Sequence, residues 1–140
     1  MFKSIVLFVL ASAMAAPNPR PEPQPLNRPV NDEMMTKREN TAENVRATYF
    51  EVGLGACGWW NSNDDHIIAL NSAQFDNGEH CGKWLGIRNP ETENIQYGYV
   101  ADECPSCGWG ELDLSPSLFG ALSNDNYDEG VFNMNWWWTG

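Results

Sequence analysis

The segment that decides the fold is residues 102–116, which reads D-E-C-P-S-C-G-W-G-E-L-D-L-S-P. It holds a C-x-x-C pair and then an acid, Asp113, between two leucines. Ser115 and Pro116 follow, and a serine N-cap before a proline at the first helical position predicts a short helix through Leu122. An acid between apolar residues is costly unless it is hydrogen-bonded or functional. Asp113 is therefore either a groove residue or a structural hydrogen-bond acceptor.

Short apolar runs separated by turn residues dominate the chain outward from this segment. We expect strands at 47–52, 67–70, 84–88, 95–101 and 130–138. Asn71 and Ser72 are a possible cap for one helical turn. In the last run Phe132, Met134, Trp136 and Trp138 alternate and share one face. These patterns predict an all-β domain with one or two short helices, built as a small barrel or sandwich.

The four cysteines, Cys57, Cys81, Cys104 and Cys107, allow three disulfide pairings. A domain of about a hundred residues is marginally stable without cross-links, and two disulfides are the default in a secreted chain. A zinc site is disfavoured, because Cys57 and Cys81 form no second C-x-x-C and an oxidising compartment opposes thiolate ligation. We expect no metal and no cofactor.

The first 40 residues predict the compartment. Residues 1–16 have a basic residue, an apolar run and small residues at A-x-A spacing, which indicates a secretory signal peptide. Residues 17–38 are rich in proline and end at Lys37-Arg38, so they form either a pro-region or a plain linker. The domain proper is then 39–140, located outside the cell or at the cell wall, with no membrane partner because the apolar run is too short.

The net charge of the chain limits the classes of partner that it can bind. The whole chain carries a net −11, and residues 39–140 hold three basic against sixteen acidic side chains, a net of −13. Nucleic acid is excluded as a ligand, because nothing here neutralises a phosphate backbone. Acidic polymers are repelled, so neutral glucans or chitin are the expected glycans. We expect the protein to be a monomer.

The motifs together carry a resemblance. Ala47-Thr48-Tyr49-Phe50 leading to G-L-G-A-C-G at 53–58, then H-C-G at 80–82 and residues 102–116, occur in the order and spacing seen in small secreted fungal double-psi β-barrel proteins. The chain resembles the RlpA-like, expansin-related group, which includes the loosenins, from Arg46 to Trp138. The resemblance implies a six-stranded double-psi β-barrel with an open polysaccharide groove. It also implies that Cys57 pairs with Cys81, and Cys104 with Cys107.

The same resemblance suggests roles for two carboxylates. Asp113 falls on the aspartate of the expansin H-F-D motif, whose equivalent is the general acid of related endoglucanases, but Glu111 and Leu112 replace the histidine and phenylalanine. Glu51 follows Tyr49 and Phe50 as the endoglucanase base follows its aromatic pair, although it is Glu rather than Asp. Inverting hydrolysis needs two carboxyl groups about 6.5–9.5 Å apart. If the protein is an enzyme, Asp113 is the acid and Glu51 the base; otherwise Glu51 is a solvated residue.

Aromatic residues supply the binding argument, because an indole plane stacks on the apolar face of a sugar ring. Trp59, Trp60 and Trp109 lie among turn residues, which predicts that they are exposed. The expected polysaccharide-binding residues are Tyr49, Trp59, Trp60, Asp102, Trp109 and Asp113. Asp102, two residues before Cys104, has a structural role as its alternative. Trp84 and Trp136 are expected in the core.

Three functions compete. The first is a non-hydrolytic, expansin-like protein that binds and loosens neutral cell-wall polysaccharide. The second is a secreted protein-binding module, such as a cysteine-protease inhibitor or an effector that meets a host protein. The third is a glycosidase or lytic transglycosylase that uses Asp113 and Glu51. Adhesion to insoluble cellulose or chitin separates the first from the second, and release of reducing sugar identifies the third.

Overall fold

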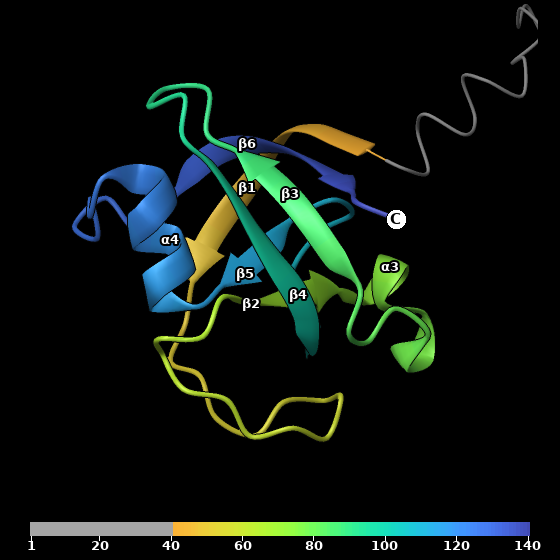
Figure 1. Cartoon of the computed structure of the whole chain (residues 1–140). Helices are drawn as coiled ribbons and strands as arrows, with labels where there is room; N and C mark the ends of the chain where they lie inside the picture. Colours follow the sequence, from red (N-terminus) through yellow and green to blue (C-terminus); the bar gives the residue numbers. More distant parts are fainter. Residues whose placement is uncertain (1–40) are drawn as a thin grey trace, which may run out of the picture. The chain divides into compact units, whose positions relative to one another are not determined.

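The computed structural model describes residues 41–140, so the predicted signal peptide (1–16) and proline-rich region (17–38) lie outside the described residues. The strands are β1 Thr41–Tyr49, β2 Ile67–Asn71, β3 Trp84–Arg88, β4 Ile95–Cys104, β5 Leu112–Leu114 and β6 Phe132–Trp138. The helical segments are α3 Ser72–Phe75, the 3-10 turn η2 Asp76–Gly78 and α4 Pro116–Ser123 (Figure 1).

The six strands close into a barrel in the order β1-β5-β2-β4-β3-β6, and β6 pairs with β1 to complete the circle. Two neighbouring pairs are parallel, β1 with β5 and β2 with β4, while the other pairs are antiparallel. The expected all-β, six-stranded barrel with short helices is thus confirmed. A closed barrel leaves no free sheet edge, whereas an open sheet of the same strands would expose one at each side.

The core fills the barrel from alternate positions of the strands. Phe132, Met134 and Trp136 of β6 point inward as predicted, and Trp136 is 1% exposed. Leu85 and Ile87 of β3 are also fully buried. Their neighbour Trp84 was expected in the core, and this prediction is wrong, because it stands on the outer face and is 49% exposed.

The strand bounds differ from those expected in two places. β1 begins at Thr41 and ends at Tyr49, before the predicted strand's last residues. β5 was not predicted, because three residues are too few to show an alternation. Both helix starts occur where the caps indicated. The Asn71 side chain accepts a hydrogen bond from the Gln74 amide at the start of α3, whereas the Ser115 hydroxyl accepts from the Ile67 amide of β2 instead of capping α4.

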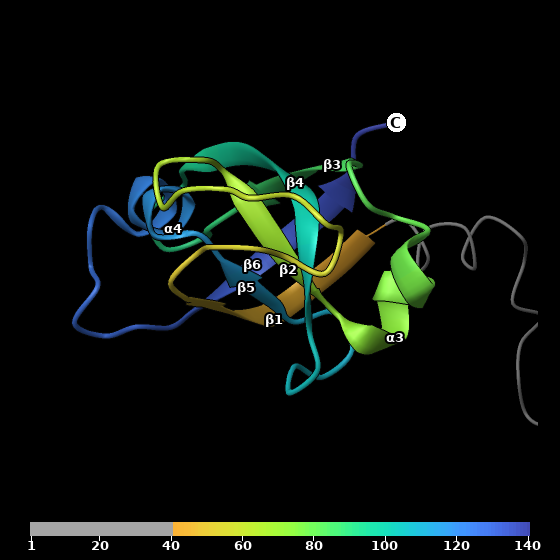
Figure 2. The same ribbon diagram turned by 90° about the horizontal axis from the view of Figure 1, so that it is seen from below.

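The disulfides are Cys57–Cys81 and Cys104–Cys107, the pairing that the resemblance implied. The first ties the long loop between β1 and β2 to the turn before β3. That loop, residues 50–66, extends below the barrel in Figure 1 and crosses in front of it in Figure 2. The second disulfide closes the turn after β4. Within residues 41–140 no helix is long and apolar enough to span a bilayer.

Candidate functional site

A row of four residues crosses four adjacent strands on the outside of the barrel. Thr48 of β1 is in register with Asp113 of β5, Asp113 with Ala69 of β2, and Ala69 with Asp102 of β4. Residues in register share a face of the sheet. Leu112 and Leu114, on either side of Asp113, belong to the core, so Asp113 and the rest of the row face outward. We call these four residues the carboxylate row. Ala69, a small and buried residue, lies in this row with an acid on each side.

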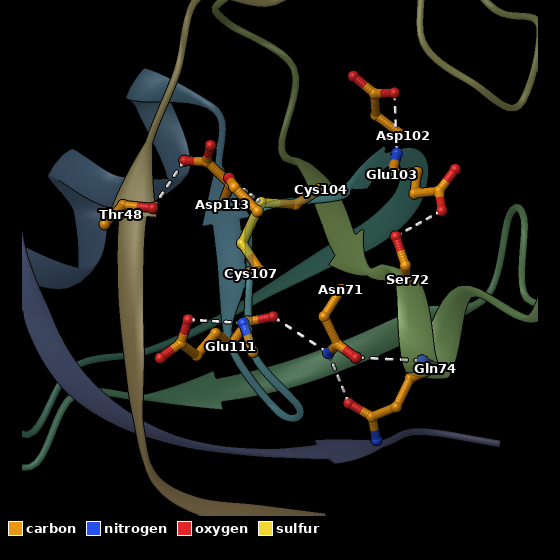
Figure 3. Close-up of a disulfide and its surroundings, with 12 residues drawn as sticks. Thr48, Asn71, Ser72, Gln74, Asp102, Glu103, Cys104, Cys107, Glu111 and Asp113 are labelled. Atoms are coloured by element: carbon orange, nitrogen blue, oxygen red, sulfur yellow. Dashed lines mark hydrogen bonds between the residues drawn. A yellow bond between two sulfur atoms is a disulfide. The ribbon is translucent and has the colours of Figure 1, made fainter.

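Asp113 is held half-buried at the centre of this row. The Thr48 hydroxyl donates to Asp113 Oδ1 at 2.9 Å, and Figure 3 shows the pair facing each other beside the Cys104–Cys107 disulfide. Burial raises the pKa of Asp113 above its ordinary value of 3.8. The charge of Asp102 raises this pKa further, while the Thr48 hydrogen bond and the positive charge of Arg46 oppose the rise. The Asp113 carboxyl therefore binds its proton more tightly than an ordinary aspartate does.

A small pocket of about 90 Å³ opens beside Asp113. Its lining is mostly polar and comes from β1, the end of β4, the second disulfide and β5: Arg46, Thr48, Cys104, Ser106, Cys107, Glu111, Leu112 and Asp113. We call it the Asp113 pocket. Hydroxyl, carboxylate and guanidinium groups together supply both donors and acceptors, which is the hydrogen-bonding character of a sugar hydroxyl partner.

Asp102 is fixed by backbone amides. Its Oδ1 accepts hydrogen bonds from the Ala56 and Glu103 amides, both at 2.8 Å. The β2–β4 ladder shifts register between Ile68 and Ala69, and such a bulge re-aims the side chain that follows it. The carbonyl of Ala101, at this irregularity, accepts from the Cys57 amide. Asp102 thus anchors the loop of residues 53–58 to β4. This contact is the structural role that the sequence offered as an alternative to sugar binding.

That anchoring depends on a glycine. The loop passes so close to β4 that a Cβ at Gly55 would collide with the carbonyl oxygen of Ala101. Only glycine allows this approach. The G-L-G-A-C-G motif therefore serves to lay the loop on the barrel beside the carboxylate row.

The other predicted site residues lie apart from Asp113. Glu51 is exposed in the loop after β1, where Asn63 Nδ2 donates to Glu51 Oε2 at 3.5 Å. The Tyr49 ring packs against Phe119 with centroids 4.7 Å apart, and its hydroxyl donates to the Tyr127 carbonyl. Neither side chain lines the Asp113 pocket.

The three turn tryptophans are all exposed: Trp59 by 44%, Trp60 by 77% and Trp109 by 55%. None of the three lines the Asp113 pocket. Trp60 pairs with Leu54 in the loop, and Trp109 lies in the turn between the second disulfide and β5. Trp59 instead lines a second, open pocket of about 330 Å³ with Trp84, Tyr99, Asn61 and Gly82, which we call the aromatic cup.

Sequence reasoning missed Thr48 and Arg46 in the Asp113 pocket, and Trp84 and Tyr99 in the aromatic cup. The alternation along β3 carried a signal for Trp84, because inward Leu85 and Ile87 place their neighbours outside. No local signal existed for Thr48, which meets Asp113 across 65 residues of sequence. Within residues 41–140 no group of three or more His, Cys, Asp and Glu is arranged to hold a metal ion.

Solved structures with this barrel give it a place among known folds. The expansin of Clavibacter michiganensis, solved as an aspartate-to-asparagine variant in complex with cellohexaose, matches with a TM-score of 0.63 and 25% identity. The match covers 71% of this chain and 50% of the expansin chain. The fold is the double-psi β-barrel of the expansins. The present chain spans about half the length of the expansins it matches.

Two other double-psi barrels match nearly whole. The Streptomyces papain inhibitor has a TM-score of 0.61 and 25% identity, over 71% of this chain and 94% of the inhibitor. Cerato-platanin 3 from M. perniciosa has a TM-score of 0.55 and 14% identity, over 69% of this chain and 93% of its own, and shares the fold alone. No family model and no curated protein matches the sequence.

Proposed function

We propose that the protein is a secreted, expansin-like barrel that binds neutral cell-wall polysaccharide, a glucan or chitin, along the carboxylate row and loosens it without hydrolysis. The observation that carries the proposal is the half-buried Asp113, which lines a polar pocket and lies in register with Thr48 and Ala69. The expansin crystallised with cellohexaose has the same barrel at 25% identity, which supports a β-linked glucan as the ligand.

Binding without cleavage follows from how the carboxylates are engaged. The acid whose charge acts on Asp113 is Asp102, and Asp102 Oδ1 already accepts two backbone amides. These two hydrogen bonds hold the Asp102 carboxylate against the backbone. Glu51, the other candidate base, is exposed and bonded to Asn63 in the loop. The row therefore offers acceptors for sugar hydroxyls rather than a matched acid and base.

The test is adhesion of the purified protein to insoluble cellulose and chitin, together with the extension of a cellulose sheet under load. We expect the wild type to adhere and to increase extension without releasing reducing sugar. Asp113→Ala should lower the affinity by about tenfold to a hundredfold, because a hydrogen bond to a charged group contributes roughly 1.5–3 kcal/mol. Asp113→Asn retains an acceptor oxygen and should adhere better than Asp113→Ala.

Asp128→Ala is the matched control, since it removes one acid from an exposed loop position outside both pockets. It should adhere as the wild type does. Release of reducing sugar that disappears in Asp113→Asn would replace the proposal with the glycosidase or lytic transglycosylase. Failure to adhere to any uncharged polysaccharide would remove the proposal altogether.

One observation favours a second candidate, a cysteine-protease inhibitor. The match to the papain inhibitor covers 94% of that chain, whereas the expansin match covers half of its chain. The loop that carries Leu54, Trp59 and Trp60 presents exposed apolar side chains of the kind that fill a protein partner's pockets. A papain activity assay with the purified protein tests it. Inhibition that is lost in Trp60→Ala, with no adhesion to glycan, would favour this candidate.

A further inference from the structure

The aromatic cup shares no residue with the Asp113 pocket, and nothing in the carboxylate row accounts for it. Its floor is the outer face of β3 and β4, where Trp84 and Tyr99 are in register, and its wall is Trp59 from the loop. At about 330 Å³ it falls within the range of small-molecule sites. Trp59 and Trp84 are each nearly half exposed. Large apolar side chains that lie together at the surface of a protein often mark a binding site.

The three rings are held in place before any ligand arrives. The Trp84 and Tyr99 ring centroids are 5.1 Å apart with planes tilted by 52°, and the Trp59 and Tyr99 centroids are 6.4 Å apart with planes tilted by 60°. Trp59 lies over Gly82, where an added Cβ would come within 3.3 Å of the indole. Gly82 has φ +82°, a conformation that favours glycine. The Cys57–Cys81 disulfide joins the two segments, because Cys57 lies two residues before Trp59 and Cys81 directly precedes Gly82.

One polar group of the cup, the Tyr99 hydroxyl, has its orientation fixed by a hydrogen bond. Asn61 Nδ2 donates to the Tyr99 hydroxyl at 2.7 Å and to Asp65 Oδ2 at 3.3 Å, so the carboxylate fixes the orientation of the amide. The Tyr99 oxygen is then an acceptor from Asn61, and its own hydrogen points elsewhere. Asn61 Oδ1 is buried and lacks a hydrogen-bond partner among residues 41–140. The cup thus combines apolar planes with a phenol that has a hydrogen to donate.

Charge selects the class of ligand. None of the five lining residues is charged, so the cup has no group that could form an ion pair with a ligand. The surrounding domain is strongly acidic, which repels anions. A pyranose ring has an apolar face for stacking and hydroxyl oxygens that accept from a phenol. We propose that the aromatic cup is a second, independent binding site for an uncharged pyranose unit of a glycan chain.

The experiment is a titration of the full-length purified protein with cellohexaose and with chitohexaose, followed through the indole N–H signals of its seven tryptophans. We expect the Trp59 and Trp84 signals to move and the signal of Trp136, in the core, to stay. Trp84→Ala should weaken binding at the cup by about tenfold or more. Tyr99→Phe, which removes one oxygen, should weaken it by about threefold.

Tyr97→Phe is the matched control, because it removes a phenolic oxygen from the outer face of the same strand, two residues from Tyr99 and outside the cup. It should bind as the wild type does. Asp113→Ala should leave the Trp59 and Trp84 shifts intact, so failure of the proposed function and failure of the cup are distinguishable. Signals of Trp59 and Trp84 that stay fixed with both sugars would overturn the inference. Shifts caused by a synthetic proline-rich peptide of residues 17–38, but by neither sugar, would also overturn it.

Discussion

Asp113 sits where a carboxylate opposes folding. Its pKa is raised chiefly by burial, so between pH of about 3.8 and the raised value the folded chain binds more protons than the unfolded chain. The stability of the fold therefore falls as the pH rises through that window. An acid retained at such a position is better explained by what it binds than by what it stabilises.

The first prediction follows from that sign. Asp113→Asn cannot ionise and keeps the acceptor for Thr48, so its Tm should exceed that of the wild type by a few degrees at about pH 7, and the difference should shrink toward about pH 3.5. Thr48→Val removes the hydrogen bond that favours the charged form and should steepen the loss of stability with pH. Thermal unfolding followed by circular dichroism measures both. Wild-type and Asp113→Asn profiles that run parallel with pH would contradict the sign.

Residue-level inference succeeded where a neighbour constrained the answer. The exposure of Trp60 and Trp109 was predictable from flanking glycine, asparagine and aspartate, because turns lie at the surface. Trp84 was expected in the core because it begins a strand directly after the Cys81 segment, but the buried Leu85 beside it turns it outward. The Tyr99 hydroxyl and its amide partner Asn61 belong to separate segments, so nothing local could predict their contact.

At the scale of elements, the two disulfides differ in what they restrain. Cys57–Cys81 spans 24 positions and fastens the loop that carries Trp59, whereas Cys104–Cys107 spans three. Replacing the first pair by alanines should lower the free energy of unfolding by about 3 kcal/mol, and replacing the second by about 2 kcal/mol, since the closed loop is longer in the first. Urea denaturation of the two double variants measures this. Equal or reversed costs would contradict the order.

The strands show why sequence gave more of the fold than of the site. Two runs that flank the polar tip at 89–94 predicted β3 and β4, and alternation predicted β6, each close to its observed bounds. The carboxylate row depends on β1 lying parallel to β5, two strands far apart in the chain. Parallel pairing needs a long crossover connection, and no local pattern specifies which strands it joins. The resemblance implied the six-stranded double-psi barrel, but the pairing of β1 with β5 was not predicted and comes from the structure.

At the scale of the whole molecule, net charge sets the salt dependence of binding. With a net of −13 on residues 39–140, adhesion to uncharged cellulose should change by less than about twofold between about 0.01 M and 0.15 M salt, because no long-range attraction is screened. Retention on a polyanion such as polygalacturonate should be weakest at low salt. Chitosan, a polycation, is the opposite control and should hold the protein best at low salt. A loss of cellulose adhesion on adding salt would contradict the neutral-ligand assignment.

Barrel closure has a consequence for biosynthesis. β6 pairs with both β1 and β3, and it is the last of the six strands to leave the ribosome. Until it emerges, both partners present bare amide and carbonyl ladders, a state prone to pair with other nascent chains. Folding of the finished chain is then a late, non-local event, slow for a protein of this length. We therefore expect the yield of folded protein to depend on how long that unpaired state lasts.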